Sequence, residues 1–314
     1  MLAIVYRRYG PPEVLGLEEI EKPVPGNDEV LIKVHSASVN PYDWHFMRGE
    51  PRFMRLMAGL TKPKSIRLGV DAAGVIEAVG RNVTDLKSGD EVFGGVRGAF
   101  AEYACTRAAA VAKKPANVTF EHAGCATIAG ITALQALRDK GRIQAGSTVL
   151  VNGASGGVGT FAVQIARSFG AGVTGVCSTR NVDMVRGLGA DRVIDYTKED
   201  FAKGAEQFDI VVDSVWTHTL ADSKRVVKRG GIYLIIGGPP DQIMKAMLSS
   251  VLTGGMVTMM MTKSSRQDLV ALGELMAAGK LTSVIDRRYP LRDVPAAIRY
   301  LEEGHARGKV VIAV

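Results

Sequence analysis

Residues 149–159 of this 314-residue chain read VLVNGASGGVG, a short apolar run followed by a turn of small residues. Such a run, bounded by glycine and followed by apolar positions at helical spacing, is typical of a buried strand that leads into a helix. Small residues at 154, 156 and 159 fit the pattern G-x-G-x-x-G, with alanine in the first place. In that pattern, backbone N–H groups at the helix start hold a pyrophosphate. The stretch predicts a dinucleotide-binding turn.

Strands and helices alternate from this turn onward. Short Val/Ile-rich strands are predicted at 148–152, 173–177, 192–195, 208–213, 231–236 and 256–261, with helices at 157–169, through Leu188 and before the fifth strand. Continuous apolar strands that alternate with helices indicate a parallel sheet covered on both faces. The sequence therefore predicts an α/β, doubly wound (Rossmann) nucleotide-binding domain.

The remainder of the chain has a different pattern. Closely spaced β-like runs at 30–34, 73–80 and 91–94 predict an antiparallel barrel or sandwich. Apolar positions at 123–137 have helical spacing, and after the parallel array we expect a helix at 268–278 and a strand at 308–314. The length fits two domains.

The charge is concentrated in one segment. The whole chain has a formal net charge of +7, and residues 48–67 hold six basic residues against Glu50, a net of +5. No basic stripe runs along the rest of the chain, so we expect no nucleic acid partner. Hydrophobic residues make up 46% and charged residues 23%, which excludes disorder or a coiled coil for the whole chain.

Cysteine usage and hydropathy bear on the compartment. Cys105, Cys125 and Cys177 have no paired spacing, which favours a reducing compartment and free thiols. The first residues do not form a signal-peptide pattern, and the longest weakly polar stretch, 247–261, is too short to span a membrane. We therefore expect a cytoplasmic protein without a transmembrane segment.

The end of the second strand predicts which dinucleotide binds. An NAD site has Asp or Glu about 20 residues after the glycines. Here the strand ends in Cys177, Ser178, Thr179 and Arg180, with no acid before Asp183. A hydroxyl and a guanidinium suit a 2′-phosphate, so the sequence predicts NADPH.

Several motifs, in order along the chain, resemble one family. They are NPYDW (40–44), GVDAAG (69–74), GITAL (130–134), the glycine turn, LGAD through IDY (188–196) and GHARGK (304–309). Over essentially its whole length the chain resembles the zinc-independent quinone oxidoreductase branch of the medium-chain dehydrogenase/reductase superfamily. It looks most similar to members that reduce α,β-unsaturated carbonyls, including the chloroplast-envelope homologues.

The resemblance implies a domain layout and a set of cofactor contacts. A GroES-like, mostly β catalytic domain would be split between 1–122 and 263–314, with the Rossmann domain at 123–262. The glycine turn and the resemblance together predict the following cofactor contacts: Ala154, Ser155, Gly156, Gly157, Val158, Gly159, Ser178, Arg180, Tyr196, Val215, Gly237, Gly238 and Lys309.

The metal-ligand positions of the zinc alcohol dehydrogenases are replaced in this chain. Where those enzymes have a cysteine and a histidine–glutamate pair, this sequence has residues 40–44 and 69–71, and residues 94–103 contain no cysteine. The five histidines have no metal spacing. We therefore expect no metal.

Without a metal, hydrogen-bond donors must polarise the substrate carbonyl. The expected activity is NADPH-dependent hydride transfer to small apolar quinones or to the C=C bond of enones. Asn40, Tyr42 and His45 lie in the loop that matches the family's active-site loop and are the candidate catalytic residues, although each also fits a turn or cleft-wall position. Two alternatives are a zinc-free carbonyl/alcohol dehydrogenase and a crystallin-like RNA-binding or structural protein.

Two further segments carry predictions about partners. Residues 48–67 fit a flexible apolar lid, a membrane-surface helix with a basic face, or a plain surface helix. Residues 253–261 predict an unprotected edge strand that pairs two copies into a homodimer, as the family resemblance also implies. The alternative is that helix 268–278 covers this edge.

Overall fold

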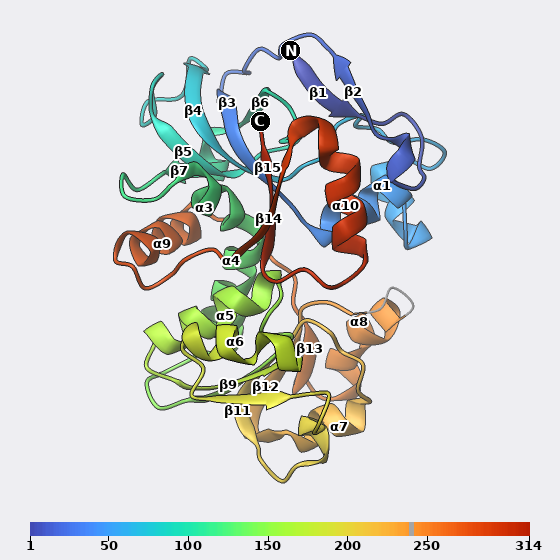
Figure 1. Ribbon diagram of the computed structural model, residues 1–314, viewed down its shortest axis with the longest axis vertical. Helices are drawn as coiled ribbons and strands as arrows, with labels where there is room; N and C mark the ends of the chain where they lie inside the picture. The colour runs from blue at the N-terminus through green and yellow to red at the C-terminus, as the bar shows by residue number, and fades with distance from the viewer. Residues whose placement is uncertain (239–241) are drawn as a thin grey trace. The chain divides into compact units, whose positions relative to one another are not determined.

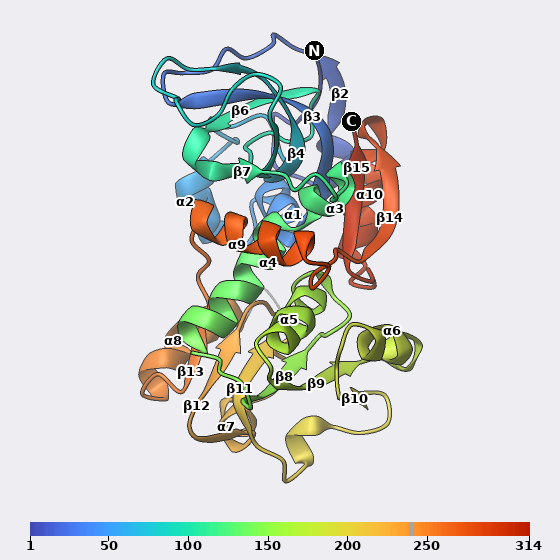
Figure 2. The same cartoon turned by 90° about the vertical axis from the view of Figure 1, so that its left-hand side faces the viewer.

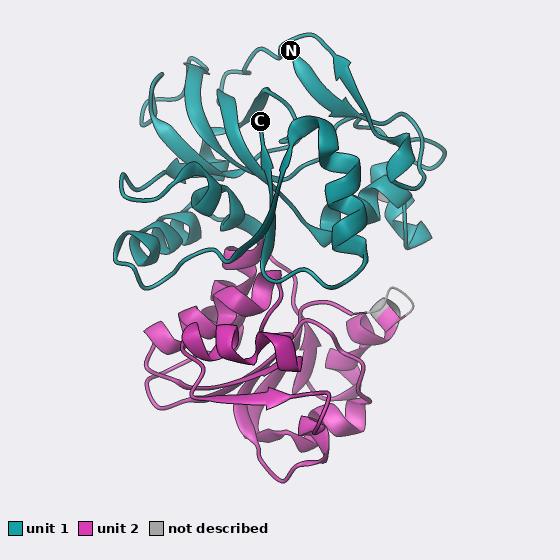
Figure 3. Ribbon diagram, viewed as in Figure 1, with its two compact units in different colours: residues 1–128, 264–314 teal, residues 129–263 magenta. Residues whose placement is uncertain are grey.

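The computed structural model describes residues 1–238 and 242–314, which form two compact units (Figure 3). Unit 1 comprises Met1–Ile128 and Ser264–Val314, and unit 2 comprises Ala129–Lys263. The first division lies later than the predicted 122/123. The reason is that α3 (Phe120–Cys125) packs on β3 (Glu29–Val39) and β4 (Asp71–Val79), and that Ile128 N donates to Asp71 Oδ1 at 3.1 Å.

The sheet of unit 1 is built from both ends of the chain (Figure 1). Its order is β14-β15-β3-β4-β5-β7, with β6 also paired to β3, while β1 and β2 form a separate ribbon. All these pairings are antiparallel except that of β14 with β15. The remaining strands are β1 (Leu2–Val5), β2 (Gly16–Glu19), β5 (Glu91–Gly95), β6 (Tyr103–Arg107), β7 (Val111–Lys113), β14 (Ile285–Pro290) and β15 (Lys309–Ala313).

Short helices surround this sheet. Asn40 precedes α1, and the Asp43 carboxylate in the first turn of that helix accepts from Asn40 N at 2.8 Å. The other helical segments of unit 1 are α2 (Arg55–Ala58), α9 (Arg266–Ala277), α10 (Val294–Glu302), the 3₁₀ turns η1 (Pro12–Val14), η2 (Arg52–Met54), η3 (Ala108–Ala110) and η8 (Leu291–Asp293), together with α1 (Pro41–Arg48) and α3.

The segment 48–67 does not form the helix that its apolar spacing indicates. After Arg48, the last residue of α1, it contains η2 and the four-residue α2, which is followed by Gly59, where φ is +122°. Arg48 pairs with Glu302, and the Arg55 guanidinium stacks over the Tyr9 ring at 4.6 Å. The amphipathic helix required by the membrane-surface alternative is therefore absent from this segment.

Unit 2 contains a six-stranded, wholly parallel sheet in the order β10-β9-β8-β11-β12-β13. Figure 2 shows the six strands in this order across the view. The strands are β8 (Thr148–Asn152), β9 (Gly172–Cys177), β10 (Arg192–Asp195), β11 (Phe208–Asp213), β12 (Val227–Ile235) and β13 (Val257–Met259). The predicted doubly wound sheet, accompanied by a mostly β second domain, is confirmed.

Helices connect these strands and cover the sheet. α5 packs on β8 and β9, α6 on β9 and β10, and α7 on β12. The helical segments are α4 (Thr127–Gln135), the π-helical turn η4 (Ala136–Lys140), α5 (Gly157–Ser168), η5 (Thr179–Asn181), α6 (Val182–Gly187), η6 (Phe201–Lys203), α7 (Leu220–Arg225) and α8 (Ile243–Leu252). Across both described stretches of the chain, no helix combines the length and apolarity that crossing a membrane requires.

The strand order places the candidate site. The chain runs from β8 outward to β9 and β10, and later from β11 to β12 and β13 on the other side. Ligands of such sheets bind beyond the carboxyl ends of the strands where this reversal occurs. The residues that end β8, β9 and β11 therefore lie at the candidate site of unit 2.

Candidate functional site

The turn between β8 and α5 is shaped by two glycines. Gly153 adopts φ +80°, a conformation that favours glycine, and its N–H and that of Ala154 both donate to Val176 O. A Cβ on Gly159 would lie 2.1 Å from Gly153 O, so only glycine lets the helix approach the turn this closely. Ala154 is fully buried, which places its side chain inside the turn. The residue of this turn with a left-handed backbone conformation is thus Gly153, one position before Ala154, the first small residue of the predicted pattern.

The amino end of α5 is open to an anion. Gly156 precedes the helix without a side-chain cap, and the first turn holds no acidic residue. The first N–H groups of a helix have no intrahelical acceptor and carry partial positive charge. Gly157 and Val158 present such groups, and Ser155 lies next to them in the turn. This arrangement fits the pyrophosphate of a dinucleotide.

The carboxyl end of β9 brings two predicted residues together through a third. Asn181 Nδ2 donates to Ser155 Oγ and to Ser178 Oγ, each at 3.1 Å. Asn181 is only 5% exposed, whereas Arg180 and Tyr196 are exposed. Asn181 is not among the residues predicted from the sequence. The local pattern that indicates its role is its position three residues after Ser178, at which an asparagine amide can donate to a preceding serine hydroxyl.

A carboxylate at the end of the neighbouring strand β10 accepts from threonine hydroxyls. Asp195, at the end of β10, accepts from Thr179 Oγ1 at 2.6 Å and from Thr197 Oγ1 at 2.8 Å. The hydrogen bond from Thr179, followed by those from Thr197, lowers the pKa of Asp195 to about 2. Its carboxylate is therefore ionised, and it also lies 3.4 Å from the Lys198 ammonium.

A buried carboxyl organises the ends of β8, β11 and β12. Asp213 Oδ1 accepts from Asn152 Nδ2 at 2.9 Å and from the N–H groups of Val215 and Trp216 at 2.8 and 2.9 Å. Tyr233 donates its hydroxyl proton to Oδ2. Burial raises the pKa of Asp213 above its ordinary value, and these donors oppose the rise. Asp213 is not among the residues predicted from the sequence, because its partners come from two other strands, β8 and β12, and from the loop after β11.

The Asp213 bonds hold a loop of unusual conformation. Trp216 has φ +39°, rare for an aromatic residue, and it is 2% exposed. A Cβ on Gly237 would lie 3.2 Å from Ser214 O, one on Gly238 3.5 Å from Val215 O, and one on Gly153 3.1 Å from Val215 Cγ2. The structure therefore brings the predicted Val215, Gly237 and Gly238 together beside the glycine turn.

Unit 1 contains a separate buried cluster of charged and polar side chains. Lys309 Nζ donates to Asn40 Oδ1 at 2.6 Å and lies 3.9 Å from Asp71 Oδ2. Asp71 also accepts from Ser38 Oγ, Asn40 Nδ2 and Ile128 N. Lys309 is 3% exposed and Asp71 is fully buried. Burial raises the pKa of the Asp71 carboxyl, while Lys309 and the hydrogen-bond donors lower it. The predicted cofactor contact of Lys309 stays a prediction; here its ammonium binds Asn40.

The three candidate catalytic residues differ in the protons that they have to offer. Asn40 Nδ2 donates to Ser38 O and Asp71 Oδ2, which occupies both of its hydrogens. His45 Nδ1 lies 2.9 Å from Glu50 O, so this nitrogen carries the proton, and burial lowers the pKa of the imidazole. Neutral His45 therefore has only an acceptor left. Tyr42 is 43% exposed and stacks on Phe46 at 4.1 Å, and burial raises its pKa, so the phenol keeps its proton.

Comparisons with known proteins agree with this geometry. Residues 26–116 match the alcohol dehydrogenase GroES-like domain, and residues 188–312 match the zinc-binding dehydrogenase family. The chain is 36% identical over 330 residues to the 2-methylene-furan-3-one reductase of Solanum lycopersicum, covering 99% of this chain and 79% of that protein. The chain belongs to the quinone oxidoreductase branch of the medium-chain dehydrogenase/reductase superfamily. The predicted family and the prediction of an oxidoreductase are confirmed.

Solved structures of this superfamily share the whole fold. The quinone oxidoreductase from Coxiella burnetii has a TM-score of 0.89 and 30% identity, covering 100% of this chain and 99% of the other. The Escherichia coli quinone oxidoreductase, solved with NADPH, has a TM-score of 0.84 and 25% identity and covers both chains completely.

One matching family is described as zinc-binding, and a catalytic zinc ion needs at least three His, Cys or carboxylate ligands. Within residues 1–238 and 242–314, no three His, Cys, Asp or Glu side chains gather as metal ligands. Asp71 already lies 3.9 Å from the Lys309 ammonium and accepts from three further donors. A carboxylate held in this way, without two further ligands beside it in the described residues, does not fit a zinc ion.

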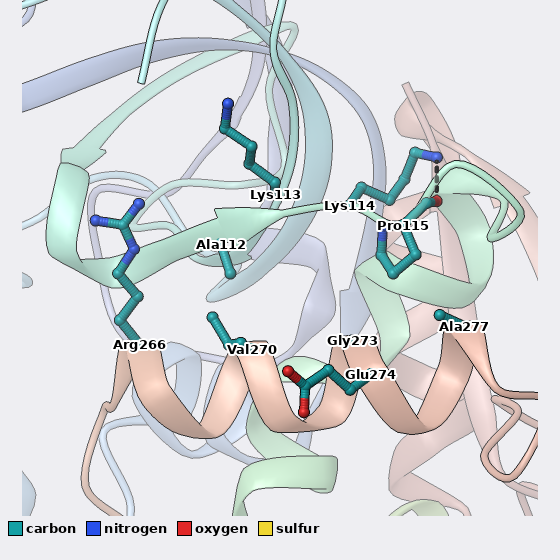
Figure 4. A pocket seen from close by; sticks show the side chains of 9 residues that line it. All are labelled: Ala112, Lys113, Lys114, Pro115, Arg266, Val270, Gly273, Glu274 and Ala277. Atoms are coloured by element: carbon teal, nitrogen blue, oxygen red, sulfur yellow. Dashed lines mark hydrogen bonds between the residues drawn. The ribbon is translucent and has the colours of Figure 1, made fainter. Parts of the chain in front are cut away.

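A pocket of about 390 Å³ lies elsewhere in unit 1, between α9 and β7 (Figure 4). Lys114 on its wall donates to Pro115 O and Val118 O and pairs with Glu91. None of the predicted site residues lines this pocket. Its lining residues are Ala112, Lys113, Lys114, Pro115, Arg266, Val270, Gly273, Glu274 and Ala277.

Proposed function

We propose that this oxidoreductase uses NADPH, without zinc, to reduce small apolar quinones or the C=C bond of α,β-unsaturated carbonyls. The observation that carries the proposal is the polar edge at the carboxyl end of β9. There Ser155 and Ser178 share the Asn181 amide, and Arg180 is exposed. Hydroxyl and guanidinium donors suit a 2′-phosphate, whereas a free carboxylate at this place would repel it.

The residues of each unit have separable tasks. The N–H groups at the start of α5 hold the pyrophosphate, and Ser178 and Arg180 bind the 2′-phosphate. Bound NADPH supplies the hydride. Tyr42 donates a hydrogen bond to the oxygen on which negative charge develops when an enone or quinone is reduced. The protons of the other two candidates, Asn40 and His45, are already donated within the protein. Asn40 holds Lys309 and Asp71 in place.

The similarity to an enone reductase supports the substrate class. In a 2-methylene-furan-3-one, the C=C bond is conjugated to the ketone, and the tomato relative is named for reducing that compound. A substrate of this kind needs a donor for the enolate oxygen but no metal. The Lys309–Asp71 pair, in place of a zinc ligand set, supports the metal-free part of the proposal.

A substrate panel followed at the NADPH absorbance tests the proposal. We expect turnover with enones and quinones, little with simple ketones or alcohols, and weaker use of NADH. Tyr42→Phe should lower kcat by about 10²-fold or more and leave NADPH binding unchanged, with Tyr103→Phe as the control. Turnover of ketones alone indicates a carbonyl dehydrogenase, and salt-dependent RNA retention without turnover indicates a binding protein. Stoichiometric zinc that chelators remove together with activity contradicts the metal-free mechanism.

We also propose that two copies pair through β13. This strand lies at the end of the sheet order, and in the described residues it pairs only with β12. The neighbouring α8 exposes Met247, Leu248, Val251 and Leu252, with Val251 82% exposed. The alternative cover, α9, packs on β7 of unit 1. Light scattering should report a dimer that Val257→Pro dissociates, because proline removes a ladder donor; a monomeric wild type contradicts the pairing.

The cysteines support a reducing compartment, and we propose the cytoplasm. Cys105, Cys125 and Cys177 are free thiols, and burial raises the pKa of each of them. Thiols held in the protonated form react slowly with oxidants. Fractionation of cells that express the full-length protein tests the compartment.

A further inference from the structure

Ser155, Ser178 and Arg180 are called the nucleotide edge of unit 2, and the Asn181 amide connects its two parts. Ser155 belongs to the turn before α5 and Ser178 follows β9, so they lie far apart in the sequence. Asn181 Nδ2 donates one hydrogen to each Oγ, at 3.1 Å in both cases. Its other amide atom, Oδ1, is buried and has no hydrogen-bond partner. Asn181 thus uses its full donor capacity on these two hydroxyls.

This connection determines what the serines can do. A serine hydroxyl has one proton and two lone pairs. When Oγ accepts from Asn181, its proton stays free to donate elsewhere. Both hydroxyls are therefore left as donors at the edge where phosphate groups are expected.

The reversed amide would have the opposite effect. With Oδ1 toward the serines, both hydroxyl protons would point at Asn181, and two buried N–H donors would have no acceptor. Buried N–H groups without a partner are rarer in proteins than carbonyl oxygens without one. The orientation that leaves only Oδ1 without a partner is therefore the more stable of the two.

We propose that Asn181 is a positioning residue for NADPH recognition: it directs the Ser155 proton toward the pyrophosphate and the Ser178 proton toward the 2′-phosphate. The inference rests on the proposed function, because both phosphates belong to NADPH. Hydrogen bonds to charged groups are stronger than neutral ones, so two oriented hydroxyls contribute substantially to affinity. NADH has the pyrophosphate but lacks the 2′-phosphate, so it uses only the Ser155 part.

Asn181→Asp gives the sharpest test, because it keeps the side-chain shape and replaces the donor by an acceptor. The carboxylate would take both serine protons and place a negative charge beside the phosphates. Measured by fluorescence titration of the full-length protein, the NADPH dissociation constant should rise by about 100-fold or more and that of NADH by about tenfold. Asn181→Ala, which leaves the hydroxyls free to rotate, should weaken NADPH binding by less than Asn181→Asp.

The order of these variants separates positioning from a structural role. Under the proposal, Asn181→Ala weakens NADPH binding more than NADH binding, because only NADPH has the 2′-phosphate that Ser178 faces. If Asn181 only packs the turn, Asn181→Ala weakens the binding of both cofactors by the same factor, and the proposal is wrong. In a Ser178→Ala background, the hydroxyl that Asn181 positions is absent. There, Asn181→Asp should change the ratio of NADPH affinity to NADH affinity less than it does in the wild type, and only through its added charge. Asn27→Asp, at an exposed residue of unit 1, controls for the change in net charge of the chain. A wild type that binds no NADPH refutes the proposed function, whereas tight NADPH binding by Asn181→Asp refutes this inference alone.

Discussion

The buried cluster of unit 1 and the nucleotide edge of unit 2 are made of similar groups used in different ways. Each combines an asparagine amide, serine hydroxyls and a cation. In unit 1, Asn40 Nδ2 donates to the Ser38 backbone carbonyl and to Asp71, and Asn40 Oδ1 accepts from Lys309, so its amide is complete within the protein. In unit 2, Asn181 leaves the protons of Ser155 and Ser178 free. A closed network stabilises a fold, whereas oriented donors left at an edge are suited to a ligand.

The largest effect is expected when the hydrogen-bond network of Asn40, Asp71 and Lys309 is broken. Lys309→Met keeps much of the side-chain length but removes the cation that faces Asp71 and Asn40. Losing one partner of a buried ion pair costs about 3–5 kcal/mol of stability, so denaturant unfolding should show a large fall in the free energy of unfolding. Lys280→Met, at an exposed lysine, should change little. A stable Lys309→Met protein with weakened NADPH binding would instead place Lys309 at the cofactor, as the family resemblance implies.

The second effect concerns Asp43, which lies in the same unit and is fully buried. Burial raises the pKa of its carboxyl to about 7, although Asn40 N and Gly69 N donate to it. The folded pKa exceeds the unfolded value of about 4. The contribution of Asp43 to the free energy of unfolding is therefore fully present below about pH 4, and it is lost as pH rises through about 7, because the buried carboxyl must then ionise. The loss amounts to at most roughly 4 kcal/mol.

Unfolding of Asp43→Asn over this pH range measures the loss. The amide imitates the protonated carboxyl, so the variant should match the wild type near pH 4 and gain on it toward pH 8. Asp293→Asn, at an exposed carboxyl, is the matched control. A variant that becomes less stable than the wild type at pH 8 would mean that the two N–H bonds outweigh burial.

The smallest effect is expected at the nucleotide edge of unit 2, when the Arg180 guanidinium is removed. Arg180→Ala should raise the NADPH Michaelis constant about ten- to hundredfold, because one charge-assisted contact contributes roughly 1.5–3 kcal/mol. NADH should be little affected, and stability should stay near that of the wild type. Arg186→Ala, which removes an exposed partner of Asp183, is the control. Equal losses for both cofactors would show that Arg180 does not read the 2′-phosphate.

Local patterns predicted the elements whose causes are local. The strand 148–152, the turn and the helix after it follow from apolar runs and small residues, and the structure has β8 and α5 there. The parallel order follows from the alternation of strands and helices. By contrast, the helical spacing across 53–60 was misleading, because Gly59 ends α2 after one turn.

Sequence patterns do not predict hydrogen bonds between segments that are distant along the chain. The Asn40 amide is occupied through Lys309, which comes from the other end of unit 1. The importance of Asn181 depends on the approach of Ser155, which precedes β9. Neither approach leaves a periodic signal, so sequence reasoning found the loops of the site but not the hydrogen-bond partners that assign their roles.

The split of unit 1 has a consequence for the order of folding during synthesis. Unit 2 is one continuous stretch, so all its strands are available once Lys263 has emerged from the ribosome. The central strand β3 of unit 1 precedes unit 2 along the chain, but its neighbour β15, which pairs Val310 with Val39, is made only after the whole of unit 2. Contacts between such distant segments form slowly, and an unpaired strand edge can aggregate while it waits. The nascent chain thus has a folded nucleotide-binding unit while one side of β3 is still open to chaperones.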